Sequence, residues 1–211
     1  MTVQPAAILA SGSPRRALIL QRAGVKAQIV LPALDDADAP TDMRDPCAHV
    51  MSLAWFKARL VLGQISQGQV SGDPSKLPRW LIAADTMCVL DGRILGKASD
   101  AQELRGMLRS FQGRAHEVVT GVCIVDRTSG GRRLFFDSAS VHLGELNAGE
   151  VDRYADSNEW QGKAGGYNYQ DRLEAGWPLR CDGDPETVMG LPSRLVLPAI
   201  GAAPIRPKGT A

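Results

Sequence analysis

A strand-to-helix turn near the N-terminus constrains the fold most strongly. Residues 6–10 (Ala-Ala-Ile-Leu-Ala) form an apolar run that predicts a short buried strand, which stops at the small residues Ser11, Gly12 and Ser13. Pro14 suits the first turn of a helix, because its missing N–H has no partner to lose there, and Ser13 stands at the N-cap position. Residues 6–22 therefore predict a strand, a tight loop and a helix, in that order.

This turn also has the features of an anion site. Arg15 and Arg16 follow Pro14 directly, so two guanidinium groups stand beside the free N–H groups of a helix start. Phosphate is the natural ligand for such a turn. The alternative is an ordinary turn with two solvated arginines. On this stretch alone that alternative is slightly favoured, because the glycine pattern matches neither a P-loop nor a dinucleotide fingerprint.

Composition sets broad limits. The chain has 211 residues, 44% of them hydrophobic, which predicts one domain, or one domain with two lobes, around a full core. A net charge of +1 gives no basic field for nucleic acid or membranes, so neither is an expected partner. No apolar run suggests a signal peptide or a membrane span. The cysteines are widely spaced, which argues against a metal finger or a disulfide framework and favours a reducing cytoplasm. They are Cys47, Cys88, Cys123 and Cys181.

Hydrophobic periodicity and turn residues divide the rest of the chain into strands and helices. Helices are predicted over residues 15–22, 45–62, 101–112 and 147–157, with a last helix ending near residue 197. Strands are predicted over residues 26–31, 80–84, 87–90, 93–95, 116–125 and 134–143. Residues 63–79 predict a long loop, and residues 198–211 a tail without fixed structure.

Two charged residues stand where apolar ones are expected. Lys57 lies on the apolar stripe of the helix predicted over 45–62, so it either extends its ammonium to solvent or meets an anion. Asp85 lies between two apolar runs, and carboxylates in such positions cluster at functional sites. Capping of a nearby loop is the alternative for Asp85. We favour a functional role for it, because both of its flanks resemble core strand.

Three further features have a functional and a plain interpretation. The acidic loop of Asp35, Asp36 and Asp38 could hold a hard cation or be solvated. Glycines around Lys163 suggest close approach of the backbone to a ligand, or a flexible surface loop. His116 is more typical of a structural histidine than of a catalyst.

Taken in order, the motifs resemble those of one family, the Maf-like proteins, house-cleaning nucleoside triphosphate pyrophosphatases also described as septum-formation inhibitors. The matching stretches cover nearly the whole chain: residues 9–16, 53–58, 84–86, 94–97, 116–122, 162–167, Gln170 and 190–192. The resemblance implies a single domain over residues 1–197. It implies an α/β fold of the inosine-triphosphatase-like type, an elongated mixed sheet flanked by helices with a cleft between two lobes. Family members are often homodimers, so a homodimer is expected.

The resemblance also implies an activity and a set of site residues. Family members cleave the α–β phosphoanhydride of a nucleotide with a divalent metal, Mg²⁺ or Mn²⁺, giving the monophosphate and pyrophosphate. The expected catalytic residues are Asp85, which falls on the family's proposed general base, with Lys57 and Lys97. The expected substrate-binding residues are Ser11, Ser13, Arg15, Arg16, Thr86, Lys163 and Gln170. The expected metal ligands are Asp36 and Asp85, where the pair Asp35-Asp36 replaces the family's usual Asp-Glu. The residues leave open whether Asp85 takes a proton from water or holds the metal.

The expected substrates are non-standard or pyrimidine nucleotides. Arg15, Thr86 and Gln170 match the family branch that acts on dTTP and UTP. The branch that acts on 7-methyl-GTP tends to differ at the first and last of these positions, although the turn at 182–185 is more similar to that branch. Residues 171–177 replace the glycine-rich run usual after the glutamine. A nucleotide-binding regulator of cell division without turnover is the alternative from another functional class.

Overall fold

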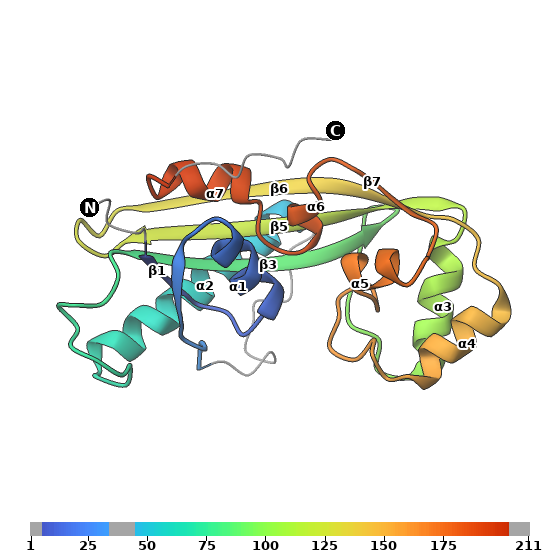
Figure 1. Ribbon diagram of the computed structural model, residues 1–211, viewed down its shortest axis with the longest axis horizontal. Helices are drawn as coiled ribbons and strands as arrows, with labels where there is room; N and C mark the ends of the chain where they lie inside the picture. The colour runs from blue at the N-terminus through green and yellow to red at the C-terminus, as the bar shows by residue number, and fades with distance from the viewer. Residues whose placement is uncertain (1–5, 34–44, 203–211) are drawn as a thin grey trace. The chain divides into compact units, whose positions relative to one another are not determined.

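Figure 1 shows the computed structural model of the chain, which describes residues 6–33 and 45–202. The chain divides into two compact units. Of the described residues, unit 1 comprises 6–33, 45–85, 120–136 and 190–202, and unit 2 comprises 86–119 and 137–189. The predicted metal ligand Asp36 and the rest of the acidic loop lie outside the described residues.

The elements alternate between strand and helix along much of the chain (Figure 1). Unit 1 holds β1 (Ala6–Leu9), α1 (Pro14–Arg22), β2 (Lys26–Ile29), α2 (Pro46–Ser66) and α7 (Ser193–Ala199). Unit 2 holds β4 (Arg93–Leu95), α3 (Ala101–Phe111), α4 (Ala148–Asp156), α5 (Tyr169–Glu174), β7 (Leu179–Asp182) and α6 (Pro185–Val188). Three long strands contribute residues to both units: β3 (Trp80–Leu90), β5 (Arg114–Asp126) and β6 (Arg132–Leu143).

The strands form one mixed sheet of seven strands in the order β2-β1-β3-β5-β6-β7, with β4 paired to β3. Strand β1 is parallel to both β2 and β3, whereas β4 and β7 are antiparallel to their neighbours. The predicted α/β class with a mixed sheet flanked by helices is confirmed. No helix in the described ranges is long and apolar enough to cross a membrane.

In unit 1, helix α2 packs closely on the sheet. Ala54, Ala58 and Val61 of α2 are fully buried in a cluster that includes residues of β1, β3 and β5. Gly121 of β5 explains the close approach. A Cβ atom at this position would lie 2.4 Å from the backbone carbon of Val50. Only glycine therefore lets the backbones of α2 and β5 come this near.

Most predicted elements are present, with differences at their ends. Asp45 caps α2 as expected, but the helix continues past residue 62 to Ser66, so Gly63 does not begin the loop. The two runs predicted as separate strands at 80–84 and 87–90 are one strand, β3, because Asp85 and Thr86 continue the extended backbone.

The C-terminal half departs further from expectation. Helix α5 and strand β7 are not predicted by the sequence pattern, since each is short and surrounded by glycine, proline and charged residues. Helix α7 ends at Ala199, and both Ile200 and Ala202 are buried, so packed structure continues past the expected boundary at residue 197. Cys88 and Cys123 are buried as predicted, and burial raises the pKa of each thiol to about 12.

The core of unit 2 contains an aromatic group around a buried histidine. The ring of His116 stacks on Phe111 with 4.2 Å between centroids, and its Nε2 lies 2.9 Å from the Tyr167 hydroxyl. Nδ1 has no hydrogen-bond partner among the described residues. Burial lowers the pKa of His116 to about 4. His116 is therefore a structural histidine, as the sequence indicates.

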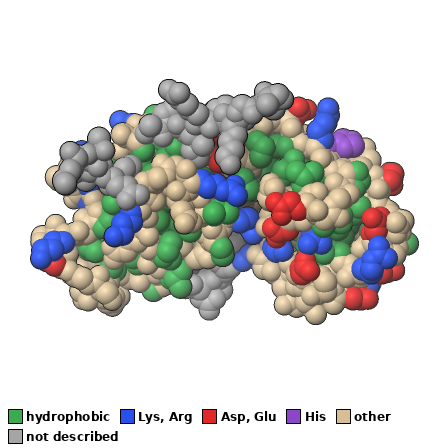
Figure 2. All heavy atoms as spheres, viewed as in Figure 1, with side chains coloured by type: hydrophobic (Ala, Val, Ile, Leu, Met, Phe, Trp, Pro, Cys, Tyr) green, Lys and Arg blue, Asp and Glu red, His purple; other side chains and the backbone are tan. Residues whose placement is uncertain are grey.

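The surface of unit 2 carries both acidic and basic side chains. Arg105 of α3 forms ion pairs with Asp152 and Asp156 of α4, at 2.7 and 3.0 Å. Figure 2 shows acidic and basic side chains next to one another on the part of the surface that α3 and α4 form, at the right of the view. This mixed pattern agrees with the low net charge of the sequence.

We expect His116 to lower the free energy of unfolding in mild acid. Its pKa of about 4 in the folded chain lies below the ordinary 6.5, so the unfolded chain takes up the proton first as the pH falls. The free energy of unfolding begins to fall below pH 6.5 and is lower by about 2 kcal/mol at pH 5. The fall is complete once the pH passes about 4. Urea unfolding of the wild type and His116→Gln at pH 7.5 and pH 5 measures this. The stability difference between the two proteins must shrink at pH 5; an unchanged difference would contradict the prediction.

Candidate active site

Asp85 lies on the face of β3 that helix α2 covers. Side chains alternate along a strand, so Leu81, Ala83 and Asp85 point to the same side of the sheet. Leu81 and Ala83 are fully buried in the cluster formed with α2. A carboxylate thus continues a row of core residues, and its side chain is 14% exposed. Such a position requires a partner for the charge.

Lys57 of α2 is that partner. Its ammonium Nζ donates a hydrogen bond to Asp85 Oδ1, and its side chain is 20% exposed. Of the two possibilities for a lysine on this stripe, the structure shows the one in which it meets an anion. The pair arises because the helical spacing that buries Ala54 and Ala58 also turns Lys57 toward β3.

The loop after β1 lies beside Asp85 in the sheet. Strands β1 and β3 are parallel, with Leu9 opposite Ile82, and the Ala10 N–H donates to the Ile82 carbonyl oxygen at 2.8 Å. The residues that follow β1 therefore run alongside Ala84 and Asp85. In parallel sheets, ligands bind outside the carboxyl ends of the strands, where such loops begin.

Arg16 joins this loop to its neighbours. Its Nη1 donates to Ser11 Oγ at 3.0 Å and to the Ala84 carbonyl oxygen at 2.8 Å. Its Nε donates to the carbonyl oxygen of Gly190 at 2.8 Å. Burial lowers the pKa of Arg16, while the nearby Asp85 carboxylate opposes that shift. Sequence reasoning did not predict that backbone carbonyls of Ala84 and Gly190 would bind this arginine.

Ser13 occupies the N-cap position of α1, as predicted, but its side chain forms no cap hydrogen bond. Its backbone N–H instead donates to Ser11 Oγ at 3.2 Å. Arg15 is half-buried in the first turn of α1. In unit 1 the structure thus brings together Ser11, Ser13, Arg16, Lys57 and Asp85.

Unit 2 carries the other expected site residues. Lys97 pairs through its backbone with Ala164, next to Lys163 in the glycine-rich turn. Lys163 Nζ lies 3.8 Å from Asp171 Oδ2, and the Gln170 amide donates to Glu174 Oε1 at 2.7 Å. Both acidic partners lie on α5, a helix that the residue pattern does not predict, so neither contact could be expected from the sequence. Thr86 follows Asp85 directly in β3.

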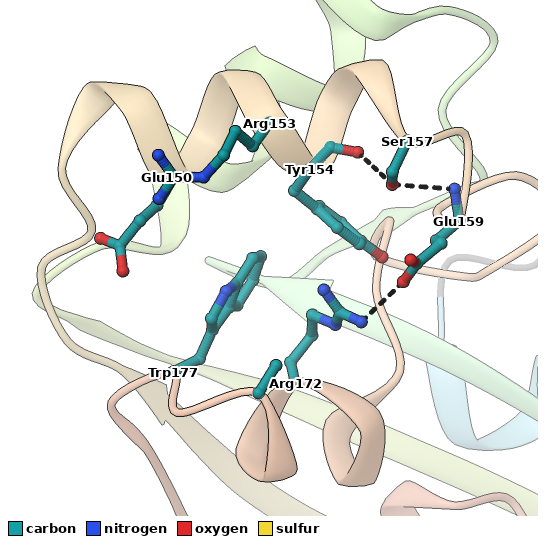
Figure 3. A pocket seen from close by; sticks show the side chains of 8 residues that line it. Glu150, Arg153, Tyr154, Ser157, Glu159, Arg172 and Trp177 are labelled. Atoms are coloured by element: carbon teal, nitrogen blue, oxygen red, sulfur yellow. Dashed lines mark hydrogen bonds and ion pairs between the residues drawn. The ribbon is translucent and has the colours of Figure 1, made fainter.

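Unit 2 also has a separate pocket, shown in Figure 3, which is lined by none of the expected site residues. Its volume is about 230 Å³, and its lining consists of Glu150, Arg153, Tyr154, Ser157, Glu159, Arg172, Ala175 and Trp177. The Arg172 guanidinium lies over the rings of Tyr154 and Trp177 and donates to Glu159 Oε2 at 2.6 Å. The Tyr154 hydroxyl donates to the Gly166 carbonyl oxygen at 3.0 Å. Tyr154 therefore links this pocket to the turn that carries Lys163.

Comparison with known proteins identifies the family. The family model of the Maf-like protein matches residues 6–203. The chain belongs to the Maf-like family. A dTTP/UTP pyrophosphatase of Pelotomaculum thermopropionicum is 36% identical over 185 residues, which are 88% of this chain and 90% of that protein. The dTTP/UTP pyrophosphatases of Rhizobium meliloti and Brucella abortus are 34% and 35% identical, over 91% of this chain and 89% and 88% of their own lengths.

We expect Lys57→Met to lower the free energy of unfolding by about 1–3 kcal/mol, because it leaves the Asp85 carboxylate without its cation among core residues. The double variant Lys57→Met/Asp85→Asn removes both charges and should be more stable than Lys57→Met. Denaturant unfolding at pH 7 measures both values. Equal stability of Lys57→Met and the wild type would show that the pair contributes nothing to folding.

Proposed function

We propose that this protein is a nucleoside triphosphate pyrophosphatase. It hydrolyses the α–β phosphoanhydride of a nucleotide, with dTTP and UTP as preferred substrates, to the monophosphate and pyrophosphate. The observation that carries the proposal is the Lys57–Asp85 pair beside the loop of Ser11 and Arg16. This arrangement holds a carboxylate and two cations at the carboxyl end of β1. Membership of the Maf-like family and the names of the similar proteins agree with it.

The proposed chemistry needs a positioned water and neutralisation of phosphate charge. Asp85 takes a proton from a water molecule, and the water oxygen bonds to the α-phosphorus. The bond from the α-phosphorus to the bridging oxygen breaks, and pyrophosphate leaves with that oxygen. Lys57, which stands at Asp85, donates to a phosphate oxygen as negative charge develops. Lys97 is proposed to share this role.

A divalent metal, Mg²⁺ or Mn²⁺, is the proposed cofactor. Within residues 6–33 and 45–202, no three His, Cys, Asp or Glu residues group closely enough to form a metal site. Asp85 supplies one carboxylate, which fits Mg²⁺, because this ion is usually held by one or two carboxylates together with substrate phosphates. Asp85 and Asp36 would hold the metal, and its positive charge would neutralise phosphate charge.

Substrate-binding residues are proposed in each unit. In unit 1, Ser11 and Ser13 would bind phosphate, and Arg15 would bind phosphate and help to select the base. In unit 2, Lys163 would bind phosphate, and Thr86 and Gln170 would help to select the base. The acidic partners on α5 are exposed, and such surface pairs are worth at most about 1 kcal/mol, so a triphosphate can displace Asp171 from Lys163.

The product and the substrate both test the proposal. Purified protein with Mg²⁺ or Mn²⁺ should release pyrophosphate and a monophosphate from dTTP and UTP, faster than from dCTP, GTP or 7-methyl-GTP. Chromatography of the nucleotide products together with separate pyrophosphate and orthophosphate assays measures this. Release of orthophosphate, or tight nucleotide binding without turnover under both metals, would overturn it. A preference for 7-methyl-GTP would overturn the substrate choice alone.

Asp85→Asn should lower kcat by about 100- to 10,000-fold, because the amide neither accepts the water's proton nor carries a charge for the metal. Asp73→Asn, which changes an exposed carboxylate of the same unit, is the matched control and should keep wild-type activity. Thermal unfolding of both variants checks that they are folded. Turnover of Asp85→Asn near that of the wild type would contradict the role assigned to Asp85.

A further inference from the structure

Arg16 is half-buried in unit 1, and its guanidinium donates hydrogen bonds to other parts of the protein. Its acceptors lie in three segments that are distant in sequence: Ser11 Oγ after β1, the Ala84 carbonyl oxygen in β3 and the Gly190 carbonyl oxygen before α7. A guanidinium presents its donors in a rigid plane. This one side chain therefore fixes the positions of three backbone segments at the carboxyl end of β1.

The bond to Ser11 determines what the hydroxyl can bind. A serine hydroxyl has one hydrogen to donate and two lone pairs that accept. Ser11 Oγ accepts from Arg16 Nη1 at 3.0 Å and from the Ser13 N–H at 3.2 Å. Both lone pairs are thus occupied, and the hydroxyl can only donate. A donor fixed in this way suits an oxygen that accepts, such as a phosphate oxygen, and cannot serve a ligand N–H.

The hydrogen bond from Arg16 to the Ala84 carbonyl oxygen affects the position of the Asp85 carboxylate. Ala84 precedes Asp85 in β3, and the bond from Arg16 restrains the peptide unit between them. The charge of Arg16 also interacts favourably with the Asp85 carboxylate. Arg16 therefore supports two of the groups of unit 1 that the proposed reaction uses, the Ser11 hydroxyl and the Asp85 carboxylate.

We propose that Arg16 is a positioning residue, which acts through Ser11 and Asp85 rather than by touching the nucleotide. It orients the Ser11 hydroxyl as an obligatory donor to a phosphate oxygen. The proposal rests on the proposed function, and it replaces the direct substrate contact that the sequence resemblance implies for Arg16. Arg15, which precedes Arg16 in the first turn of α1, remains the arginine proposed to contact the substrate.

A double-mutant cycle with Arg16→Met and Ser11→Ala tests this. In the wild-type background, Ser11→Ala should lower kcat/KM for dTTP about 10-fold or more, the effect of losing a hydrogen bond to a charged group. In the Arg16→Met background it should lower kcat/KM less than about 3-fold, because the hydroxyl is no longer held. Effects that multiply would overturn the proposal, since they would show that Arg16 acts independently of Ser11.

Arg15→Met is the matched control for general damage to the site. Its effect on kcat/KM should be the same with Arg16 and with Met at position 16, because Arg15 does not act through Arg16. If Arg16→Met also abolishes the Arg15→Met effect, the site as a whole has collapsed and the specific role is wrong. Should Arg16→Met fail to fold, Arg16→Gln takes its place in the cycle.

Arg16→Lys separates position from charge. A lysine keeps the positive charge but has no planar fork to span three acceptors. Activity as low as that of Arg16→Met supports positioning, and activity near the wild type overturns it, since charge alone would then suffice. Failure of this proposal can be told apart from failure of the proposed function. If the proposed function is wrong, the wild-type protein itself releases no pyrophosphate from any nucleotide.

Discussion

The ion pair between Lys57 and Asp85 is the interaction on which unit 1 depends, because it places two charges in a row of otherwise apolar contacts. Leu81 and Ala83 precede Asp85 on one face of β3, and Ala54 and Ala58 flank Lys57 on α2. Neither charge could occupy its place without the other, since an unpaired charge among core residues is strongly unfavourable. The same pairing supplies a carboxylate and an ammonium at the point where β1 ends and its loop begins. Stability and the proposed chemistry thus use the same two side chains.

The close packing of α2 on β5 makes this pair possible. The Val50 backbone lies against Gly121, where no side chain larger than hydrogen fits. Helix α2 is thereby held near enough to the sheet for Lys57 to reach Asp85 while remaining largely shielded from water. Arg16 of α1 then fixes the loop after β1 through hydrogen bonds to Ser11 and to the Ala84 carbonyl oxygen, next to Asp85 in the chain. Lys57 on α2, Asp85 on β3 and Arg16 on α1 are each positioned by the packing of their own element.

Residue patterns predicted the parts of this arrangement that follow from local rules. Pro14 marks the start of α1, and the spacing of apolar residues on α2 identifies Lys57 as a charge on a buried stripe. Asp85 was identified for a similar reason, a charge between two apolar runs. The partners of Arg16 could not be predicted in this way. Two of its acceptors are backbone carbonyls, which every residue has, and Gly190 is distant in sequence, so only the fold brings them together.

In unit 2, helix α5 likewise could not be predicted from the residue pattern. Residues 171–177 gave no periodic signal, because α5 is short and its stability comes from contacts outside it: Arg172 lies over Tyr154 and bonds to Glu159, and Trp177 is buried in the core. The consequence is electrostatic. Helix α5 places Asp171 by Lys163 and Glu174 by Gln170, so carboxylates already occupy the donors proposed for the nucleotide. Any ligand that binds through the side chains of Lys163 and Gln170 therefore has to displace these carboxylates first.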